Sequence, residues 1–154
     1  MRILPLAVLS LVLASCAPTL GSTGNGFVAQ TFASGQRWTV TAVGGDGSET
    51  VSFVLAPPQL VGNTGAVAFV NALRNPEGAL NYAPASAGRP VEDIMVIWDR
   101  PNNVDGFCVI RNPSAATDRK VFSGRYARSF ERARDYSRTG STTGTGTCDL
   151  KREG

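Results

Sequence analysis

Short runs in which apolar and polar residues alternate recur from residue 27 onward, and they constrain the fold more than any other feature of this chain. In the run 37–43, Trp38, Val40 and Ala42 would share one face, with polar side chains on the other. A period of two is typical of half-buried β-strands, because successive side chains of a strand point to opposite faces of the sheet. The chain is therefore predicted to be mainly β.

A first β-hairpin is predicted from this run and from a second one at 51–55, with a glycine-rich turn at 44–48 between them. Pro57 and Pro58 should end the second strand, because proline has no N–H to donate to a neighbouring strand. Glycine and proline make up 26 of the 154 residues, against roughly 12% on average, which favours many turns and short strands.

The stretch 66–73 allows two interpretations. Asn63 or Thr64 could cap a short helix over it. However, residues 75–78 read Asn-Pro-Glu-Gly, a sequence that suits a type I turn. A second hairpin, between this stretch and 79–83, is therefore the preferred interpretation.

Four more strands are predicted, over 92–98, 107–110, 121–127 and 147–151. The first contains a continuous apolar run at 94–98, as expected of a central strand with both faces covered. With about seven or eight strands joined locally, the chain is predicted to form a small antiparallel β-barrel or β-sandwich. One short helix is predicted near 126–136, where Tyr126, Phe130 and Ala133 recur at helical spacing.

The N-terminus has the pattern of a secretory signal peptide. Arg2 supplies an early positive charge, and residues 3–14 form an apolar run too short to remain as a membrane-spanning helix. In an ordinary signal peptide, cleavage would fall near Ala14 or Ala17.

Residues 13–16 read Leu-Ala-Ser-Cys and resemble the bacterial lipobox, in which signal peptidase II cuts before the cysteine and the cysteine is acylated. The resemblance implies a lipoprotein signal peptide over 1–15 and a palmitate-type anchor on Cys16. An uncharged, aperiodic tether over 16–26 and a single β-rich domain over 27–154 would follow. The protein is thus expected to be exported and lipid-anchored to the bacterial cell membrane or the outer membrane.

The chain has three cysteines. If Cys16 carries lipid, Cys108 and Cys148 remain as an even pair, and in an exported protein such a pair most often forms a disulfide. Closing a loop of about 40 residues would stabilise the fold by about 4 kcal/mol in the chain-entropy model.

The chain contains no histidine, which excludes a Ser-His-Asp triad, a Cys–His pair and a His-ligated zinc site. The adjacent Glu92 and Asp93 would point to opposite faces of a strand and could not act as a pair. The other carboxylates considered are expected to form turns, and none lies in an EF-hand loop: Asp46, Glu49, Asp99 and Asp105. No catalytic residue, metal site or cofactor is therefore predicted, and the protein is expected not to be an enzyme.

Seven basic residues fall between Arg119 and Arg138, with aromatic residues among them. Export argues against nucleic acid as a partner. The basic residues expected to contact anionic lipid or an acidic envelope polymer are Arg125, Arg128, Arg132 and Arg134. The alternative is a solvated face whose arginine stems cover the sheet. No protein partner can be named from the sequence.

Residues 35–38 read Gly-Gln-Arg-Trp and resemble the Gly-x-Trp with which lipocalin-like barrels open, although two residues separate Gly35 from Trp38 here. The resemblance implies an arginine packed on Trp38, which Arg125 or Arg152 could supply. The expected function is that of a cell-envelope lipoprotein with a non-catalytic binding or structural role. The alternatives are a lipocalin-like carrier of a small apolar ligand and, third, a hydrolase that uses carboxylates.

Overall fold

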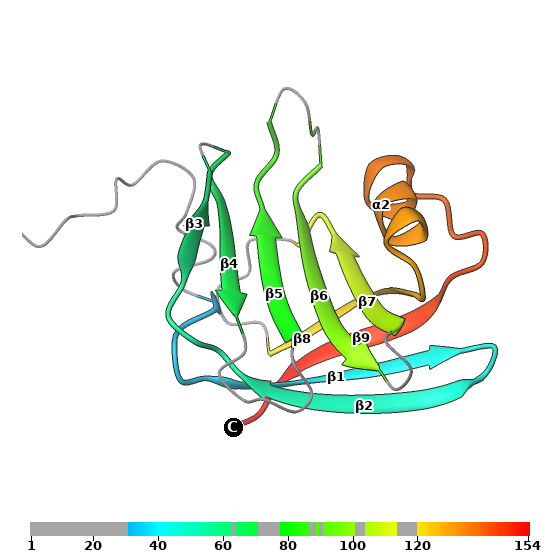
Figure 1. The fold of residues 1–154 in the computed structure, drawn as a ribbon, viewed down its shortest axis with the longest axis horizontal. Coiled ribbons are helices and arrows are strands. Elements are labelled where there is room, and N and C mark those ends of the chain that lie inside the picture. Colours follow the sequence, from blue (N-terminus) through cyan, green and yellow to red (C-terminus); the bar gives the residue numbers. More distant parts are fainter. Residues whose placement is uncertain are drawn as a thin grey trace, which may run out of the picture.

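The computed structural model describes residues 31–62, 64–70, 78–86, 89, 91–100, 104–113 and 120–154. In these residues nine strands form one antiparallel sheet, and the helix α2, Phe130–Thr139, packs on its outside (Figure 1). The strands are β1 Arg37–Gly44, β2 Gly47–Val54, β3 Gln59–Val61, β4 Ala66–Val70, β5 Gly78–Ala83, β6 Asp93–Arg100, β7 Val104–Arg111, β8 Val121–Ala127 and β9 Gly146–Arg152.

The sheet curls into a half-barrel with the strand order β2-β1-β9-β8-β7-β6-β5-β4-β3 (Figure 1). Strands that follow one another in the chain are neighbours in the sheet, except for β2 and β3, which occupy its two edges. The last strand, β9, lies between β8 and β1 and so joins the two ends of the chain's strand sequence. Pro57 and Pro58 lie in the short connection between these edge strands. Because proline cannot donate to a ladder, the pairing does not continue from β2 into β3.

The predicted antiparallel, mainly β architecture is confirmed in this coarser form, and so are the two hairpins. Strand β1 pairs with β2, with Val40 opposite Val51, and β4 pairs with β5, with Phe69 opposite Leu80. The strands form one curled sheet and not the two sheets of a sandwich, and there are nine where seven or eight were expected. The additional strand is β3, whose three exposed residues carry no alternation of burial. Of the predicted turn at 75–78, residues 75–77 lie outside the described residues, and Gly78 begins β5.

The predicted helix exists, but its expected bounds are wrong. Helix α2 begins at Phe130, after Ser129, whose side chain accepts a hydrogen bond from the Arg132 N–H as an N-cap does. It ends at Gly140, which adopts the left-handed conformation with φ 80° and donates its N–H to the carbonyl of Tyr136. Tyr126, which suggested an earlier start, belongs to β8 and is buried in the sheet's main core.

The concave face of the sheet holds the main core, and its side chains become smaller along β1. Trp38, Val40, Ala42 and Gly44 alternate on this face from one end of the strand to the other. The ring centroids of Phe32 and Phe122 lie 4.8 and 6.1 Å from that of Trp38, and Phe69 packs on Phe32 at 6.1 Å. The bulky end of β1 is therefore filled by aromatic rings, whereas its glycine end leaves room for side chains from other strands.

A disulfide joins Cys108 of β7 to Cys148 of β9, as predicted, with 5.9 Å between the two Cα atoms. Strand β8 lies between these strands in the sheet, so the bridge crosses the concave side of a sharp bend. Gly124 of β8 lies at this bend, opposite Cys148. A Cβ atom on Gly124 would lie 2.2 Å from the carbonyl oxygen of Val109, so the close approach of the strands requires glycine.

Helix α2 covers part of the convex face through its small buried residues, Ala133 and Ser137. Ala133 packs with a second apolar cluster that includes Met95 and Ile97 of β6. The Ser137 hydroxyl donates a hydrogen bond to the buried carboxylate of Asp93. Both faces of β6 are therefore covered, as its continuous apolar run predicted.

Candidate binding site

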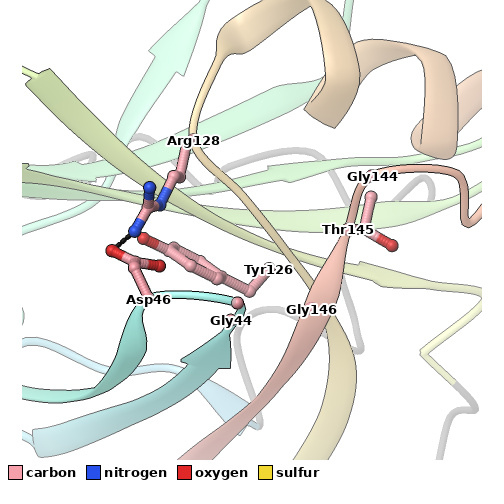
Figure 2. A pocket seen from close by; sticks show the side chains of 8 residues that line it. Gly44, Asp46, Tyr126, Arg128, Gly144, Thr145 and Gly146 are labelled. Carbon is pink, nitrogen blue, oxygen red and sulfur yellow. Dashed lines mark ion pairs between the residues drawn. The ribbon is translucent and has the colours of Figure 1, made fainter.

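A pocket of about 560 Å³ lies where the tip of the β1–β2 hairpin meets the end of β8 and the start of β9 (Figure 2). Its lining combines four glycines with one ion pair and one aromatic ring: Gly44, Gly45, Asp46, Tyr126, Arg128, Gly144, Thr145 and Gly146. The volume lies within the range of about 300–1,000 Å³ that is common for small-molecule sites. We take this pocket as the candidate binding site.

Close contacts or backbone conformation favour glycine at three of these four positions. A Cβ on Gly44 would lie 3.0 Å from the Tyr126 ring, and one on Gly146 would lie 1.9 Å from the carbonyl oxygen of Val43. Gly144 has φ +68°, a conformation that L side chains rarely adopt. Gly45 differs, because no atom lies within 4 Å of its Cβ position. The backbone therefore forms much of the pocket wall, and only Gly45 has space for a side chain.

Charged side chains of both signs meet at this end of the sheet. Arg128 pairs with Asp46 beside the pocket, and both side chains are nearly half exposed. Arg100 reaches the same carboxylate with Nη2 at 3.5 Å, and its Nε lies 2.9 Å from the carboxylate of Glu49. Two guanidinium groups thus face two carboxylates, and the formal charges of this cluster cancel.

Tyr126 forms the inner wall of the pocket and extends toward the Asp46–Arg128 pair (Figure 2). Only 3% of its surface is exposed. Its ring stacks on that of Trp98, with centroids 5.9 Å apart and planes inclined by 19°, and the Arg100 guanidinium lies 5.9 Å from its centroid. Trp98 in turn lies over Gly106, where a Cβ would come within 2.3 Å of the indole.

The Tyr126 hydroxyl is a buried polar group that lies near charges of both signs. Burial raises its pKa to about 12, the nearby Glu49 carboxylate adds to the rise, and Arg100 opposes it. In the described part of the chain, no well-aligned hydrogen bond reaches the Trp98 Nε1, and the only acceptor near the Tyr126 hydroxyl is the Glu49 carboxylate, at a poorly aligned position. The hydroxyl's residue also borders a second cavity of about 60 Å³, between Asp46 and Glu49. Buried polar atoms without partners are uncommon in folded proteins. In the described residues those of Tyr126 and Trp98 lie at this end of the sheet, and Thr31 Oγ1, next to Phe32, is another.

Of the four arginines expected to bind an anionic surface, Arg128 and Arg132 lie beside the pocket, because the Arg132 guanidinium lies against the Cβ position of Gly144. Arg128 lines the pocket, whereas Arg125 extends from β8 between Gly124 and Tyr126. On α2, the Arg132 Nη1 donates to the carbonyl of Thr143, and the Arg134 guanidinium lies 5.9 Å from the ring centroid of Phe130. In the described residues no ion pair joins these last three arginines to a carboxylate. Cys16, the expected lipidation site, lies outside the described residues.

The carboxylates also separate. Glu92 acts on Tyr82, whose pKa is raised to about 12 chiefly by burial and then by this carboxylate, whereas Asp93 pairs with Ser137 and Arg89. The two neighbouring carboxylates therefore have different partners, and β6 begins at Asp93, so Glu92 precedes the strand. The carboxylates at the hairpin tips divide into Asp46 and Glu49, which reach Arg100, and Asp99 and Asp105, which face each other across β6 and β7. The described residues include no group of three or more side chains that could hold a metal ion.

Sequence reasoning missed Tyr126, Arg100 and the glycines as parts of one site. Tyr126 falls in both the predicted strand 121–127 and the predicted helix near 126–136, and Arg100 lies between the predicted strands 92–98 and 107–110. The available signal was the second glycine-rich loop at 140–146, which resembles the turn at 44–48 in composition. Only the pairing of β1 with β9 brings these two loops together.

Comparison with protein-family models, with curated proteins and with solved structures found no match. In the part of the chain that the structure describes, no helix has the length and apolar character needed to cross a membrane. The functional argument therefore rests on the residues and the geometry of this chain.

Proposed function

We propose that this protein is an exported lipoprotein of the bacterial cell envelope, anchored by lipid on Cys16, with a non-catalytic binding or structural role. The observation that carries this proposal is the Cys108–Cys148 disulfide. Disulfides persist mainly in oxidising compartments outside the cytosol. The bridge also uses two of the three cysteines and leaves only the cysteine of the lipobox-like segment.

The chemistry of the pocket supports binding more than catalysis. Glu49 and Asp46 are held by guanidinium groups, and Tyr126 has a pKa of about 12, so its hydroxyl stays protonated at neutral pH. The chain also has no histidine, the side chain whose ordinary pKa suits proton exchange near pH 7. The pocket is better suited to holding a ligand through hydrogen bonds.

The packing of the concave face also favours this role over a lipocalin-like carrier. A carrier needs an apolar cavity of at least about 300 Å³ inside the curled sheet. In the described residues the apolar part of the concave face is occupied by the rings around Trp38. The large pocket lies instead at the polar end, with glycine backbone and an ion pair in its wall.

Contact with anionic lipid or an acidic envelope polymer remains part of the proposal. Arg132 and Arg134 are exposed on α2, and Arg125 is partly exposed on β8. We expect charge reversal at these three positions to weaken envelope association in a salt-dependent manner. If neither salt nor charge reversal changes envelope association, these arginines form a solvated surface without a role in binding.

The proposal is tested by mass spectrometry of the mature N-terminus after expression of the full chain in a bacterial host. The expected peptide begins at Cys16 and carries acyl chains, and the protein fractionates with membranes. The matched control is Cys16→Ser, which should remain unacylated. An unmodified N-terminal peptide that begins elsewhere, for example after Ala14 or Ala17, would overturn the lipid anchor.

A second measurement tests export independently of the anchor. Alkylation of the natively purified protein without reductant should leave Cys108 and Cys148 unmodified, because both are bridged. Alkylation of both residues under these conditions would contradict folding in an oxidising compartment.

A further inference from the structure

We propose that the pocket at the β1–β2 tip binds an uncharged saccharide unit. The chemical class of this ligand follows from the pocket, whereas its source, a glycan of the cell envelope, rests on the proposed function. Four properties of the site carry the inference: cancelled charge, unused hydrogen-bonding capacity, backbone walls and an open mouth.

On the Asp46 side of the pocket, the charge balance disfavours a simple ion as the ligand. Arg128 and Arg100 both contact Asp46, and Arg100 also contacts Glu49. A phosphate or carboxylate ligand would be repelled by the two carboxylates that lie beside the two guanidinium groups. A cation would be repelled by the two guanidinium groups. A neutral ligand gains from both signs without disrupting the ion pairs. On the Gly144 side, Arg132 forms no ion pair in the described residues, and the charged probes of the test address this guanidinium.

The hydrogen-bonding inventory suits vicinal hydroxyl groups. A guanidinium has five N–H donors and a carboxylate about four acceptor positions, so the Asp46–Arg128 pair leaves most of this capacity unused. A hydroxyl both donates and accepts, and two neighbouring hydroxyls of a sugar ring can therefore bridge a carboxylate and an adjacent guanidinium. Thr145 lies on the opposite wall (Figure 2); its hydroxyl donates to the carbonyl of Thr142 and keeps only its acceptor capacity for a ligand.

The walls suit a flat, partly apolar ring. Gly44, Gly45, Gly144 and Gly146 present backbone without side chains, so a ligand can approach the main chain closely. The edge of the Tyr126 ring supplies an apolar surface, and its position is held by stacking on Trp98. A sugar ring has C–H faces and hydroxyl edges, which match an apolar wall next to charged groups.

The open mouth suits a unit within a longer chain. Side chains of Arg128 and Asp46 are 45% and 43% exposed, so a ligand held between them need not be enclosed. An internal unit of a glycan could therefore occupy the pocket while the rest of the polymer continues outside.

The test uses the purified full chain in a zwitterionic detergent and isothermal titration calorimetry. The probes are uncharged disaccharides and trisaccharides of glucose, mannose and N-acetylglucosamine, with inorganic phosphate and trilysine as charged comparisons. We expect at least one uncharged saccharide to bind with little dependence on salt. Binding of phosphate or trilysine alone, or of no saccharide, would overturn the proposal.

Two pairs of variants locate the binding. Gly45→Phe fills the pocket from a position with free space and should weaken saccharide binding by about tenfold or more, whereas Ser123→Phe on exposed β8 surface should bind like the unaltered chain. Arg128→Ala should weaken binding by about tenfold, and the matched Arg134→Ala should not. Equal binding by Gly45→Phe and the unaltered chain would contradict the pocket as the site.

The same titration on Cys16→Ser separates this inference from the proposed function. Saccharide binding by the unacylated chain supports the pocket chemistry even if the N-terminal peptide proves to carry no lipid. Loss of binding in Gly45→Phe with an intact acylated N-terminus supports both.

Discussion

The two ends of the concave face, marked by Trp38 and Gly44 of β1, are filled by different kinds of side chain. At the Trp38 end, aromatic rings fill the curl, and the one charged residue that the register places directly opposite Trp38 in the described residues is Arg152 of β9. At the Gly44 end, the rings of Trp98 and Tyr126 occupy the space, and they bring buried polar atoms, Arg100 and two carboxylates with them.

The two ends therefore contribute differently to the free energy of folding. Burial of large apolar side chains is the main favourable contribution to folding, and the Trp38 end supplies much of it. Buried polar atoms without well-placed partners are unfavourable, and the Gly44 end accepts them. The pocket lies at the end that carries these buried polar atoms.

The largest effect is expected for Trp38→Ala, which empties the centre of the aromatic end. The free energy of unfolding should fall by up to about 5 kcal/mol, because the cavity cannot collapse between the rings that remain. Urea unfolding followed by circular dichroism measures the change. The control is Phe130→Ala on α2, whose aromatic ring is 52% exposed, and its loss should stay near 0.5 kcal/mol. Similar losses for the two variants would contradict the assignment of the core.

Removal of the disulfide should have the next largest effect, because the bridge lies between the two ends. The double variant Cys108→Ala, Cys148→Ala should lose about 4 kcal/mol in the chain-entropy model for a separation of 40 residues. Denaturant titration with and without reductant measures it. Reductant should destabilise the native chain and leave the double variant unchanged; an effect on the double variant would point to another cause.

Gly124→Ala tests whether the bend at β8 requires glycine. The added methyl group would meet the Val109 carbonyl at 2.2 Å and Ile110 at 2.9 Å, so stability should fall by about 1–3 kcal/mol. Gly45→Ala is the matched control, because its methyl group meets no atom within 4 Å. Thermal unfolding of both variants makes the comparison. A smaller loss at Gly124 than at Gly45 would show that the bend is not tightly packed.

The smallest effect, and one confined to alkaline pH, concerns the two buried tyrosines. The pKa of Tyr82 and of Tyr126 is raised from 10.0 to about 12 in the folded state. Their stabilising contribution is therefore full below pH 10 and is lost as the pH rises toward 12, because the unfolded chain releases these protons first.

The measurement is the melting temperature across this pH range. Tyr126→Phe and Tyr82→Phe should each flatten the alkaline decline, and Tyr126→Phe should cost little at neutral pH, because its hydroxyl has no well-aligned partner. An alkaline decline identical in both variants and in the unaltered chain would contradict the burial of these hydroxyls.

Local patterns predicted most of the strands because alternation and turn residues act over a few neighbours. The strand 121–127 has the bounds expected from its sequence, and the first hairpin and the Cys108–Cys148 bridge were also anticipated. The start of α2 was misplaced because Tyr126 fits a helical spacing by coincidence. Its burial depends on Gly44 and Trp98, which are far away in the sequence.

The candidate site was beyond prediction for a related reason. Its lining comes from the tip of one hairpin, the end of β8 and the loop before β9, and no local pattern records that β9 inserts beside β1. The expected group of four arginines divides for the same reason, since sequence proximity does not determine which side of the sheet a side chain occupies.

The sequence by itself determined the strand-rich class, the even pair of cysteines and the absence of histidine chemistry, because these follow from composition and short-range periodicity. Only the tertiary structure decided that the sheet is an open half-barrel and that Trp38, Val40, Ala42 and Gly44 taper toward a polar pocket. The physical reason is that pairing between distant strands depends on how the whole concave face packs. Each ring on this face occupies space next to a small residue that is distant in the sequence, as Tyr126 does next to Gly44.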